Sequence, residues 1–443
     1  MTDKKKVKQL LERFIAIESV SADSQKLPEV LNATSFLKKE LEELGFKVKV
    51  IGKESAPPLV TASYFVKGAE KTIGIYGHYD VQSEDPVSEW NSSPYTLVEQ
   101  KDKFWARGIA DNKGHIVQNI AAISQLIKAN SLKNNIIFIL EGEEETGSVH
   151  LESFISQVKQ ELEKVDVFYV TDTGMYSKDV PQIFYGLRGL VYFELKVTVG
   201  KRDLHSGMYG NSVANPALVA SELLGKMKDN VTGEVLIPGF YDDVRSLDSK
   251  ERKLLESSKR SDEELIEEAS VKSVQSLKGE SAYLASKVLP SLDINGFISG
   301  YTGEGPKTII PKSAVVKFSC RLVENQNPEK IRNLVLQFIQ RSIPESVDYQ
   351  VDILSEDAPF YTGIDNPEVK RTEAVLKKAF SNEVIFNRSG GSIPAAEVLQ
   401  RYFQKPVILT GFTLPDDNIH SPNENMDVEL FWKGIEVFKK LYS

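Results

Sequence analysis

The stretch Thr72-Ile-Gly-Ile-Tyr-Gly-His-Tyr-Asp80 begins as a short apolar run and ends in polar residues that can carry chemistry. Similar apolar runs recur along the chain, and helical patterns separate the first three of them. Short apolar runs that alternate with helices are typical of βαβ units, whose largely parallel sheet is buried on both faces. The runs cover 72–76, 136–140, 167–170 and 406–410, and the helical patterns cover about 115–130 and 149–162.

A different pattern begins near residue 186. In 189–199 and again in 314–322, apolar side chains alternate with polar ones, which predicts an antiparallel sheet with one covered face. We therefore predict an α/β fold with a mixed, mainly parallel sheet over 1–185 and 361–443, and an inserted α+β domain over 186–360. The charged segment 241–270 is predicted to be a solvated helical surface.

The composition limits the class of protein. Of 443 residues, 41% are apolar and 26% are charged, as in an ordinary soluble globular protein. No apolar run approaches the ~20 residues that cross a bilayer, and the N-terminus lacks the apolar core of a secretion signal. Cys320 is the only cysteine, so no intrachain disulfide can form, and the net charge of −9 disfavours nucleic acid. These features predict a cytoplasmic protein with no nucleic-acid or membrane partner.

Histidines and acidic residues follow each of the four apolar runs. In an open α/β sheet, ligands bind outside the carboxyl ends of the strands, so these side chains are expected to gather at one edge. Imidazole and carboxylate groups are ligands that Zn²⁺ prefers, and the combination predicts a metal site. The residues are His78 and Asp80, then Glu141 and Glu143–Glu145, then Asp172, and finally Asp416, Asp417 and His420.

Each residue taken alone also has an ordinary structural explanation. Glu143–Glu145 could be a solvated charge cluster, although adjacent carboxylates after a buried strand repel one another unless a cation or a proton offsets the charge. Asp172 could cap a helix, and so could Asp111, which lies between two glycines in the loop 105–115. The ordered combination, and no single residue, favours the metal.

Short motifs along most of the chain carry a resemblance to a known family. They are GHYDVQ (77–82), ARGIADNKG (106–114), EGEEETGS (141–148), TDTG (171–174), DLHSGMYGN (203–211), KTIIP (307–311), RLVENQNP (321–328), GGSIP (390–394) and IHSPNE (419–424). With these motifs in this order, the chain resembles the metallopeptidase family of carnosinases, carnosinase-type bacterial dipeptidases, succinyl-diaminopimelate desuccinylase, acetylornithine deacetylase and carboxypeptidase G. The carnosinase-like branch is the most similar.

The resemblance implies a dinuclear metal site in the larger, catalytic domain. Asp111 is implied to bridge two divalent ions, with His78 and Asp172 completing one site and Glu145 and His420 the other. Zinc is the expected metal, and manganese or cobalt would also suit this set of ligands.

The resemblance also implies two residues that assist the reaction without binding metal. Glu144 would be the general base, which takes a proton from the attacking water and delivers it to the leaving amine. Asp80 would accept the other ring N–H of His78 and orient the imidazole. A shift of one residue in the register would exchange the roles of Glu143, Glu144 and Glu145.

In the inserted domain the resemblance implies a lid that also forms a dimer. His205 would stabilise the tetrahedral oxyanion in the partner's active site of a homodimer. Arg321 would bind a terminal carboxylate, Thr308 would contribute a hydroxyl group, and Gly391 and Ser392 would line the substrate end.

The expected activity is hydrolysis of a small peptide or an N-acyl amino acid by a homodimeric two-metal amidohydrolase of the exopeptidase type. A dipeptidase acting on peptides with a free C-terminal carboxylate is the first hypothesis. An N-acyl amino acid deacylase of the desuccinylase or deacetylase type is the alternative within this class. A catalytically silent binding protein is an alternative from a different class.

Overall fold

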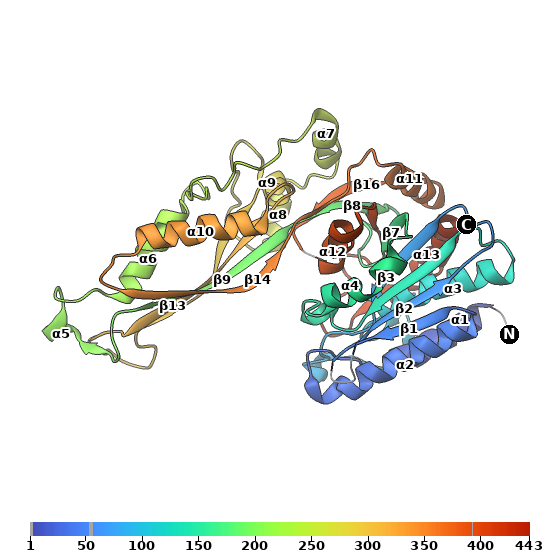
Figure 1. Ribbon diagram of the computed structural model, residues 1–443, viewed down its shortest axis with the longest axis horizontal. Helices are drawn as coiled ribbons and strands as arrows, with labels where there is room; N and C mark the ends of the chain where they lie inside the picture. The colour runs from blue at the N-terminus through green and yellow to red at the C-terminus, as the bar shows by residue number, and fades with distance from the viewer. Residues whose placement is uncertain (1–2, 53–55, 392) are drawn as a thin grey trace. The chain divides into compact units, whose positions relative to one another are not determined.

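The computed structural model describes residues 3–52, 56–391 and 393–443, and the chain divides into two compact units (Figure 1). The first unit comprises Met1–Tyr185, Thr362–Asn387 and Ile393–Ser443, and the second comprises Gly186–Tyr361 and Arg388–Ser392. The short segment 388–392 thus belongs to the second unit, whereas we had assigned everything after 361 to the larger domain. The catalytic and lid roles of the two units stay predictions.

The central sheet of the first unit is mixed and mainly parallel, which confirms the predicted fold class. β3 is parallel to both β6 and β7, and β17 is parallel to β7. β1 and β2 add an antiparallel edge, so the order is β1-β2-β6-β3-β7-β17-β8. The bounds are β1 Lys47–Ile51, β2 Leu59–Tyr64, β3 Thr72–His78, β6 Asn135–Glu141, β7 Val167–Val170, β8 Gln182–Leu187 and β17 Val407–Leu409.

Helices cover this sheet because its central strands are apolar on both faces. Every residue of β3 and β7 is buried, and α3 packs on β3 while α12 packs on β17. α13 and α1 pack in turn against α3. The helices of the unit are α1 Asp3–Ile15, α2 Leu27–Glu43, α3 Lys113–Lys128, α4 Leu151–Leu162, α11 Pro367–Phe380, α12 Pro394–Phe403 and α13 Val428–Tyr442.

A small antiparallel sheet lies beside the loop that carries Asp111. Its order is β18-β5-β4, with β4 Val98–Gln100, β5 Lys103–Trp105 and β18 Asn425–Asp427. Asn425 of β18 pairs with Trp105 of β5. This pairing brings the segment that follows His420 next to the segment that precedes Asp111.

The second unit is built on an antiparallel sheet of order β11-β13-β9-β14. One face of this sheet carries a continuous apolar core that includes Phe193 and Phe318, whose rings stack 4.8 Å apart. Helices α6 and α10 cover that face, as the alternation predicted. The bounds are β9 Gly189–Thr198, β11 Ser291–Ser299, β13 Ser313–Leu322, β14 Asp348–Asp357, α6 Pro216–Met227 and α10 Pro328–Ser342.

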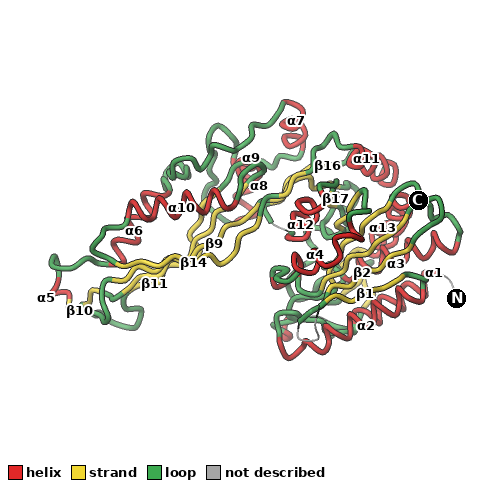
Figure 2. Tube along the Cα trace, viewed as in Figure 1, coloured by secondary structure: helices red, strands yellow, loops and turns green. Residues whose placement is uncertain are grey.

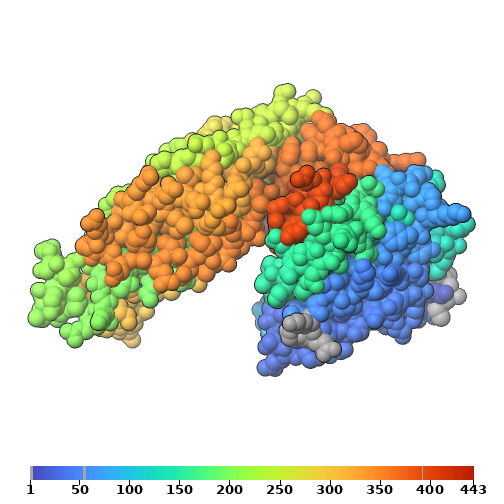
Figure 3. All heavy atoms as spheres, viewed as in Figure 1, coloured from blue at the N-terminus to red at the C-terminus, as the bar shows by residue number. Residues whose placement is uncertain are grey.

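One end of the second unit is a tip made of short elements, labelled α5 and β10 at the left of Figure 2 and including the light green atoms at the left of Figure 3. β10 (Leu204–His205) pairs with β12 (Ile309–Ile310), and the single-turn helix α5 (Ser206–Tyr209) follows directly. Met208 and Tyr209 of this turn are exposed hydrophobic side chains.

The charged segment 241–270 is less solvated than predicted. It contains α7 (Ser249–Ser257) and α8 (Asp262–Ala269), but Glu251 is 1% exposed and Leu255 is fully buried. The remaining elements of the second unit are α9 (Ala282–Val288) and β15 (Phe360–Tyr361), and β16 covers Ile385–Ser389. Among the residues that the structure describes, no helix is long and apolar enough to cross a bilayer.

Candidate metal centre

The end of β3, the loops after β6, β7 and β17, and the loop between β5 and α3 bring two groups of metal-binding side chains together at one edge of the first unit's sheet. His78, Asp111 and Asp172 form one group, and Asp111, Glu145 and His420 form the other. Within each group the candidate ligand atoms lie within 4.8 Å of one another. Asp111 is common to both groups, as a carboxylate that bridges two ions would be.

The first group is the more buried. His78 closes β3, and its Nε2 lies 2.9 Å from Asp111 Oδ1 and 3.5 Å from Asp172 Oδ1. Burial opposes the protonated form of His78, yet the Asp172 and Asp111 carboxylates raise its pKa well above the usual value. Burial raises the pKa of Asp172 to about 6, against the opposing effect of His78.

The second group is more open on one side. His420 Nε2 lies 3.0 Å from Asp111 Oδ2 and 3.1 Å from Glu145 Oε2, and about half of the His420 side chain is exposed. Hydrogen bonds to Asp111 and Glu145 raise the pKa of His420 to about 10. Gln82 donates a further hydrogen bond of 2.9 Å to Glu145 Oε2.

Asp80 is buried beneath this cluster, and its carboxylate acts on more than His78. The His78 Nδ1 atom lies 3.1 Å from the Asp80 carbonyl oxygen and 3.4 Å from its carboxylate. The same carboxylate accepts hydrogen bonds from the backbone N–H groups of Glu144 (3.3 Å) and Glu145 (3.1 Å). Asp80 therefore also fixes the turn that follows β6.

Glu144 begins that turn, a 3-10 helix over Glu144–Thr146. Burial, together with the Asp172 and Asp111 carboxylates and against the opposing effect of His78, raises the pKa of Glu144 to about 9. A carboxylate in this setting favours a proton or a nearby cation. Glu143 points elsewhere, because its carboxylate accepts hydrogen bonds from the backbone and ring of His150.

The chemistry of the cluster fits divalent cations. Glu145 Oε1 is buried and has no hydrogen-bond partner among the described residues. The three carboxylates of Asp111, Glu145 and Asp172 outnumber the two histidines, so negative charge is left over even when both imidazoles are protonated, and a cation would offset it. Nitrogen and oxygen donors of this kind suit Zn²⁺, Mn²⁺ and Co²⁺.

Glu424 supports the metal centre in a way that the sequence did not reveal. Its fully buried carboxylate accepts hydrogen bonds from Gly108, Ala110 and Asp111 backbone N–H groups at 2.8–3.0 Å. Arg107 Nη1 donates a fourth at 2.8 Å. The backbone of the loop that carries Asp111 is therefore wrapped around the Glu424 carboxylate. The sequence feature that could have indicated this role is the position of Glu424 at the end of the IHSPNE motif, four residues after His420.

Asn112 is a second residue whose part was not predicted. Its Nδ2 atom donates to Asp172 Oδ1 (2.7 Å) and to the carbonyl of Thr171 (2.8 Å). Asn112 is the neighbour of Asp111 in sequence, and it orients the Asp172 carboxylate. His115 is buried, with a pKa lowered by burial to about 4, and its Nε2 accepts the backbone N–H of Phe412.

The predicted substrate residues all lie in the second unit, at two different ends. His205 is exposed at the tip, where it pairs with Ile309, the neighbour of Thr308. Arg321 is near the opposite end of β13. Gly391 lies in the segment 388–392, and Ser392 lies outside the described residues.

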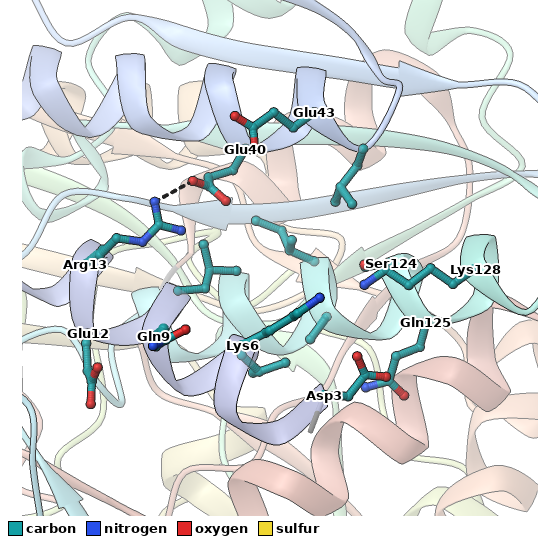
Figure 4. A pocket seen from close by; sticks show the side chains of 15 residues that line it. Asp3, Lys6, Gln9, Glu12, Arg13, Glu40, Glu43, Ser124, Gln125 and Lys128 are labelled. Carbon is teal, nitrogen blue, oxygen red and sulfur yellow. Dashed lines mark hydrogen bonds and ion pairs between the residues drawn. The ribbon is translucent and has the colours of Figure 1, made fainter. Parts of the chain in front are cut away.

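A groove elsewhere in the first unit does not contain this chemistry (Figure 4). It lies between α1, α2 and α3, with an apolar floor and a rim of both signs of charge, including the Arg13–Glu40 ion pair. The described residues that line it include none of the predicted site residues. The edge of the sheet is therefore the candidate site.

Comparison with known proteins agrees with this geometry. A family model described as peptidase family M20/M25/M40 matches residues 74–443. The chain belongs to this peptidase family. The predicted resemblance to the metallopeptidase family that includes the carnosinases is thus confirmed.

Relatives of this M20 peptidase align over nearly its whole length. The Cys-Gly metallodipeptidase DUG1 of Candida albicans is 31% identical, over 96% of this chain and 91% of that protein. The human Beta-Ala-His dipeptidase is 29% identical, over 98% and 89%. Among solved structures, the M20 family metallo-carboxypeptidase Sso-CP2 from Sulfolobus solfataricus has a TM-score of 0.86 and 33% identity, over 100% of this chain and 99% of the other.

Proposed function

We propose that this chain is a two-metal dipeptidase that hydrolyses small peptides with a free C-terminal carboxylate. The observation that carries the proposal is Asp111, shared between two groups that each add one histidine and one further carboxylate. Relatives named as dipeptidases, which align over almost the whole chain, support the substrate class.

His78, Asp111 and Asp172 would hold one ion, and Asp111, Glu145 and His420 the other. Zinc is the proposed metal, with manganese and cobalt compatible with the same donors. When bound, the two ions supply Lewis acidity, which lowers the pKa of water and polarises the scissile carbonyl.

Glu144 is the proposed general base. It begins a turn whose backbone is fixed by Asp80, so its carboxylate is held beside the ligands without belonging to either group. It would accept a proton from the attacking water and deliver it to the nitrogen of the leaving amine, which balances the hydrolysis.

Arg321 is proposed to bind the carboxylate end of the peptide. It projects from the polar face of β13, where its partner positions are Leu190 and Ser291. A planar guanidinium matches a carboxylate with two parallel hydrogen bonds. Thr308, Gly391 and Ser392 are proposed to contact other parts of the substrate.

His205 and Arg321 cannot serve the same small substrate from one chain. The tip residue Asp203 accepts the backbone N–H of Lys312, next to the start of β13 at Ser313, and Arg321 lies eight residues further along that strand. At about 3.3 Å per residue, this separation is roughly 26 Å. An extended dipeptide spans only about 7 Å.

We therefore propose a homodimer in which His205 stabilises the oxyanion in the partner's site. The exposed apolar side chains Met208 and Tyr209 beside His205, and Phe297 and Ile298 on the edge strand β11, are surfaces that a second copy would cover. The single buried cysteine is compatible with the proposed cytoplasmic location.

The activity is tested with metal-reconstituted wild type beside Glu144→Gln on a dipeptide panel and on N-acetyl and N-succinyl amino acids. We expect dipeptides to be cleaved and the variant to lose at least ~10²-fold in rate while still binding metal. If only the acyl amino acids are cleaved, the enzyme is a deacylase and not a dipeptidase. No hydrolysis together with fewer than about one metal per chain would indicate a silent binding protein.

The dimer is tested by mixing two inactive variants, His205→Ala and Glu144→Gln. A mixed dimer has one site with both groups intact, so we expect part of the activity to return when subunits exchange. If subunits exchange and no activity returns, His205 does not act in the partner's site.

A further inference from the structure

The second unit contains a network of four charged side chains, Arg245, Glu251, Glu324 and Arg388, and none of them is a predicted metal ligand. Arg388 contacts Glu251, and its Nη1 atom lies 2.6 Å from Glu324 Oε2. Arg245 contacts Glu324 and lies 2.5 Å from Glu251 Oε2. Each guanidinium therefore bridges both carboxylates.

The network is electrically balanced, and three of its four members are buried. Glu251, Arg388 and Glu324 are 1%, 4% and 8% exposed, whereas the Arg245 side chain is 29% exposed. The Tyr361 ring lies 5.2 Å from the guanidinium carbon of Arg245 and 5.3 Å from that of Arg388, so it covers both cations. Removing one member of such a network leaves a buried charge without its full set of partners.

The four charges come from segments far apart in sequence. Glu251 lies in α7, and Glu324 lies three residues after Arg321, just beyond the end of β13. Arg388 lies in the short segment 388–392, whose flanking segments 362–387 and 393–443 belong to the first unit. The network thus connects Arg388, at the start of this segment, to Glu324, just after the strand that carries Arg321.

Packing around the network extends this connection to the proposed carboxylate site. Ser389 and Arg388 line a small cavity together with Arg188. Arg188 donates a hydrogen bond of 2.8 Å to Ser291 Oγ, and Ser291 is the residue paired with Arg321 across the sheet. The Gly391 N–H donates a hydrogen bond of 3.1 Å to Ser389 Oγ. Gly391 is therefore held to Ser389, the residue that follows Arg388.

We propose that Arg388 is a positioning residue: through Glu251 and Glu324 it fixes the loop 389–391 to the second unit, so the loop and Arg321 form one preassembled pocket for the substrate's carboxylate end. The inference rests on the proposed function for the identity of the substrate. A pocket that is assembled before binding spares the substrate the cost of ordering the loop.

Kinetics of Arg388→Met and of the charge-balanced double variant Arg388→Met/Glu251→Gln test the proposal. The double variant leaves one guanidinium facing one carboxylate, so it stays informative if the single variant fails to fold. We expect KM for dipeptides to rise about tenfold with kcat within about threefold of wild type, since the loop contributes binding before and during the reaction alike. Metal content should stay unchanged.

A matched control residue, Arg252, lies on α7, the helix that also carries Glu251. Arg252 makes a two-point ion pair with Glu280 at 2.6 and 2.8 Å, outside the network. Arg252→Met removes an equivalent pair without touching the loop, and we expect wild-type KM. Arg388→Lys, which retains the charge but cannot bridge both carboxylates, should give an intermediate KM.

Hydrogen–deuterium exchange of the metal-free protein separates this inference from the proposed function. Amides 389–391 should exchange faster in the double variant than in wild type, and at the wild-type rate in Arg252→Met. Wild-type KM in a folded double variant, or unchanged exchange at 389–391, overturns the proposal. If wild type cleaves no peptide, the proposed function fails, and the exchange result alone decides the positioning of the loop.

Discussion

Each unit of the molecule buries a cluster of charged side chains, and the two clusters differ in their balance of charge. Around Asp111, the carboxylates of Asp111, Glu145 and Asp172 outnumber the two histidines, so an excess of negative charge is left even when both histidines are protonated. Around Arg388, two guanidiniums meet two carboxylates, and the charges cancel. A cluster with an excess of one sign needs a ligand of the opposite sign, whereas a balanced cluster is complete without one.

This difference in charge balance indicates that the cluster around Asp111 is a binding site and that the cluster around Arg388 is structural. The first cluster leaves Glu145 Oε1 buried without a hydrogen-bond partner among the described residues. In the second, every carboxylate oxygen of Glu251 and Glu324 has a guanidinium partner. The metal centre is therefore expected to depend on added ions, and the Arg388 network is expected to be independent of them.

Replacing the shared ligand should produce the largest effect. Asp111→Asn removes the carboxylate common to both groups, so we expect metal content below about one ion per chain and a loss of about 10³-fold or more in hydrolysis. Mass spectrometry of the metals and a dipeptide assay measure this. His150→Gln, close to the turn but outside both groups, is the control. Retention of two ions by Asp111→Asn would show that Asp111 is not the ligand that the two ions share.

Replacing Glu424 should produce a smaller effect. Glu424→Gln keeps the shape but removes the charge that faces Arg107 and one acceptor of the Asp111 loop. We expect metal affinity to fall about 10- to 100-fold, as for other residues that hold ligands in place. Titration against a competing chelator measures the affinity. Glu152→Gln, an exposed partner of Arg401, is the matched control, and equal affinities for the two variants would contradict the supporting role.

The sequence predicted the elements whose pattern is local. The strand ending at His78 and the strand carrying Arg321 follow from apolar periodicity, and both lie within a residue or two of the predicted positions. The candidate ligands His78, Asp172 and His420 could be placed at one edge because the ends of parallel strands lie together, whereas Asp111 was implied only by the family resemblance. Their assignment to two groups came from the family resemblance and not from spacing.

The rest depends on contacts between distant residues. Nothing near Glu251 indicates that its partner is 137 positions away, and a helix dense in charge favours a solvated interpretation. Glu424 and Asp111 are likewise 313 positions apart. Carboxylates of this kind look like surface residues in sequence until the fold supplies the cation or the backbone donors that permit burial.

The position of Cys320 has a practical consequence. It lies in β13 between Val191 and Leu292 of the neighbouring strands and has no exposed surface. Burial raises the pKa of its thiol far above the usual value, so the reactive thiolate does not form at neutral pH. A cysteine introduced at a surface position such as Val231 would then react alone with a maleimide dye. The native chain is already a clean background for site-specific fluorescence labelling, with no cysteine to remove first.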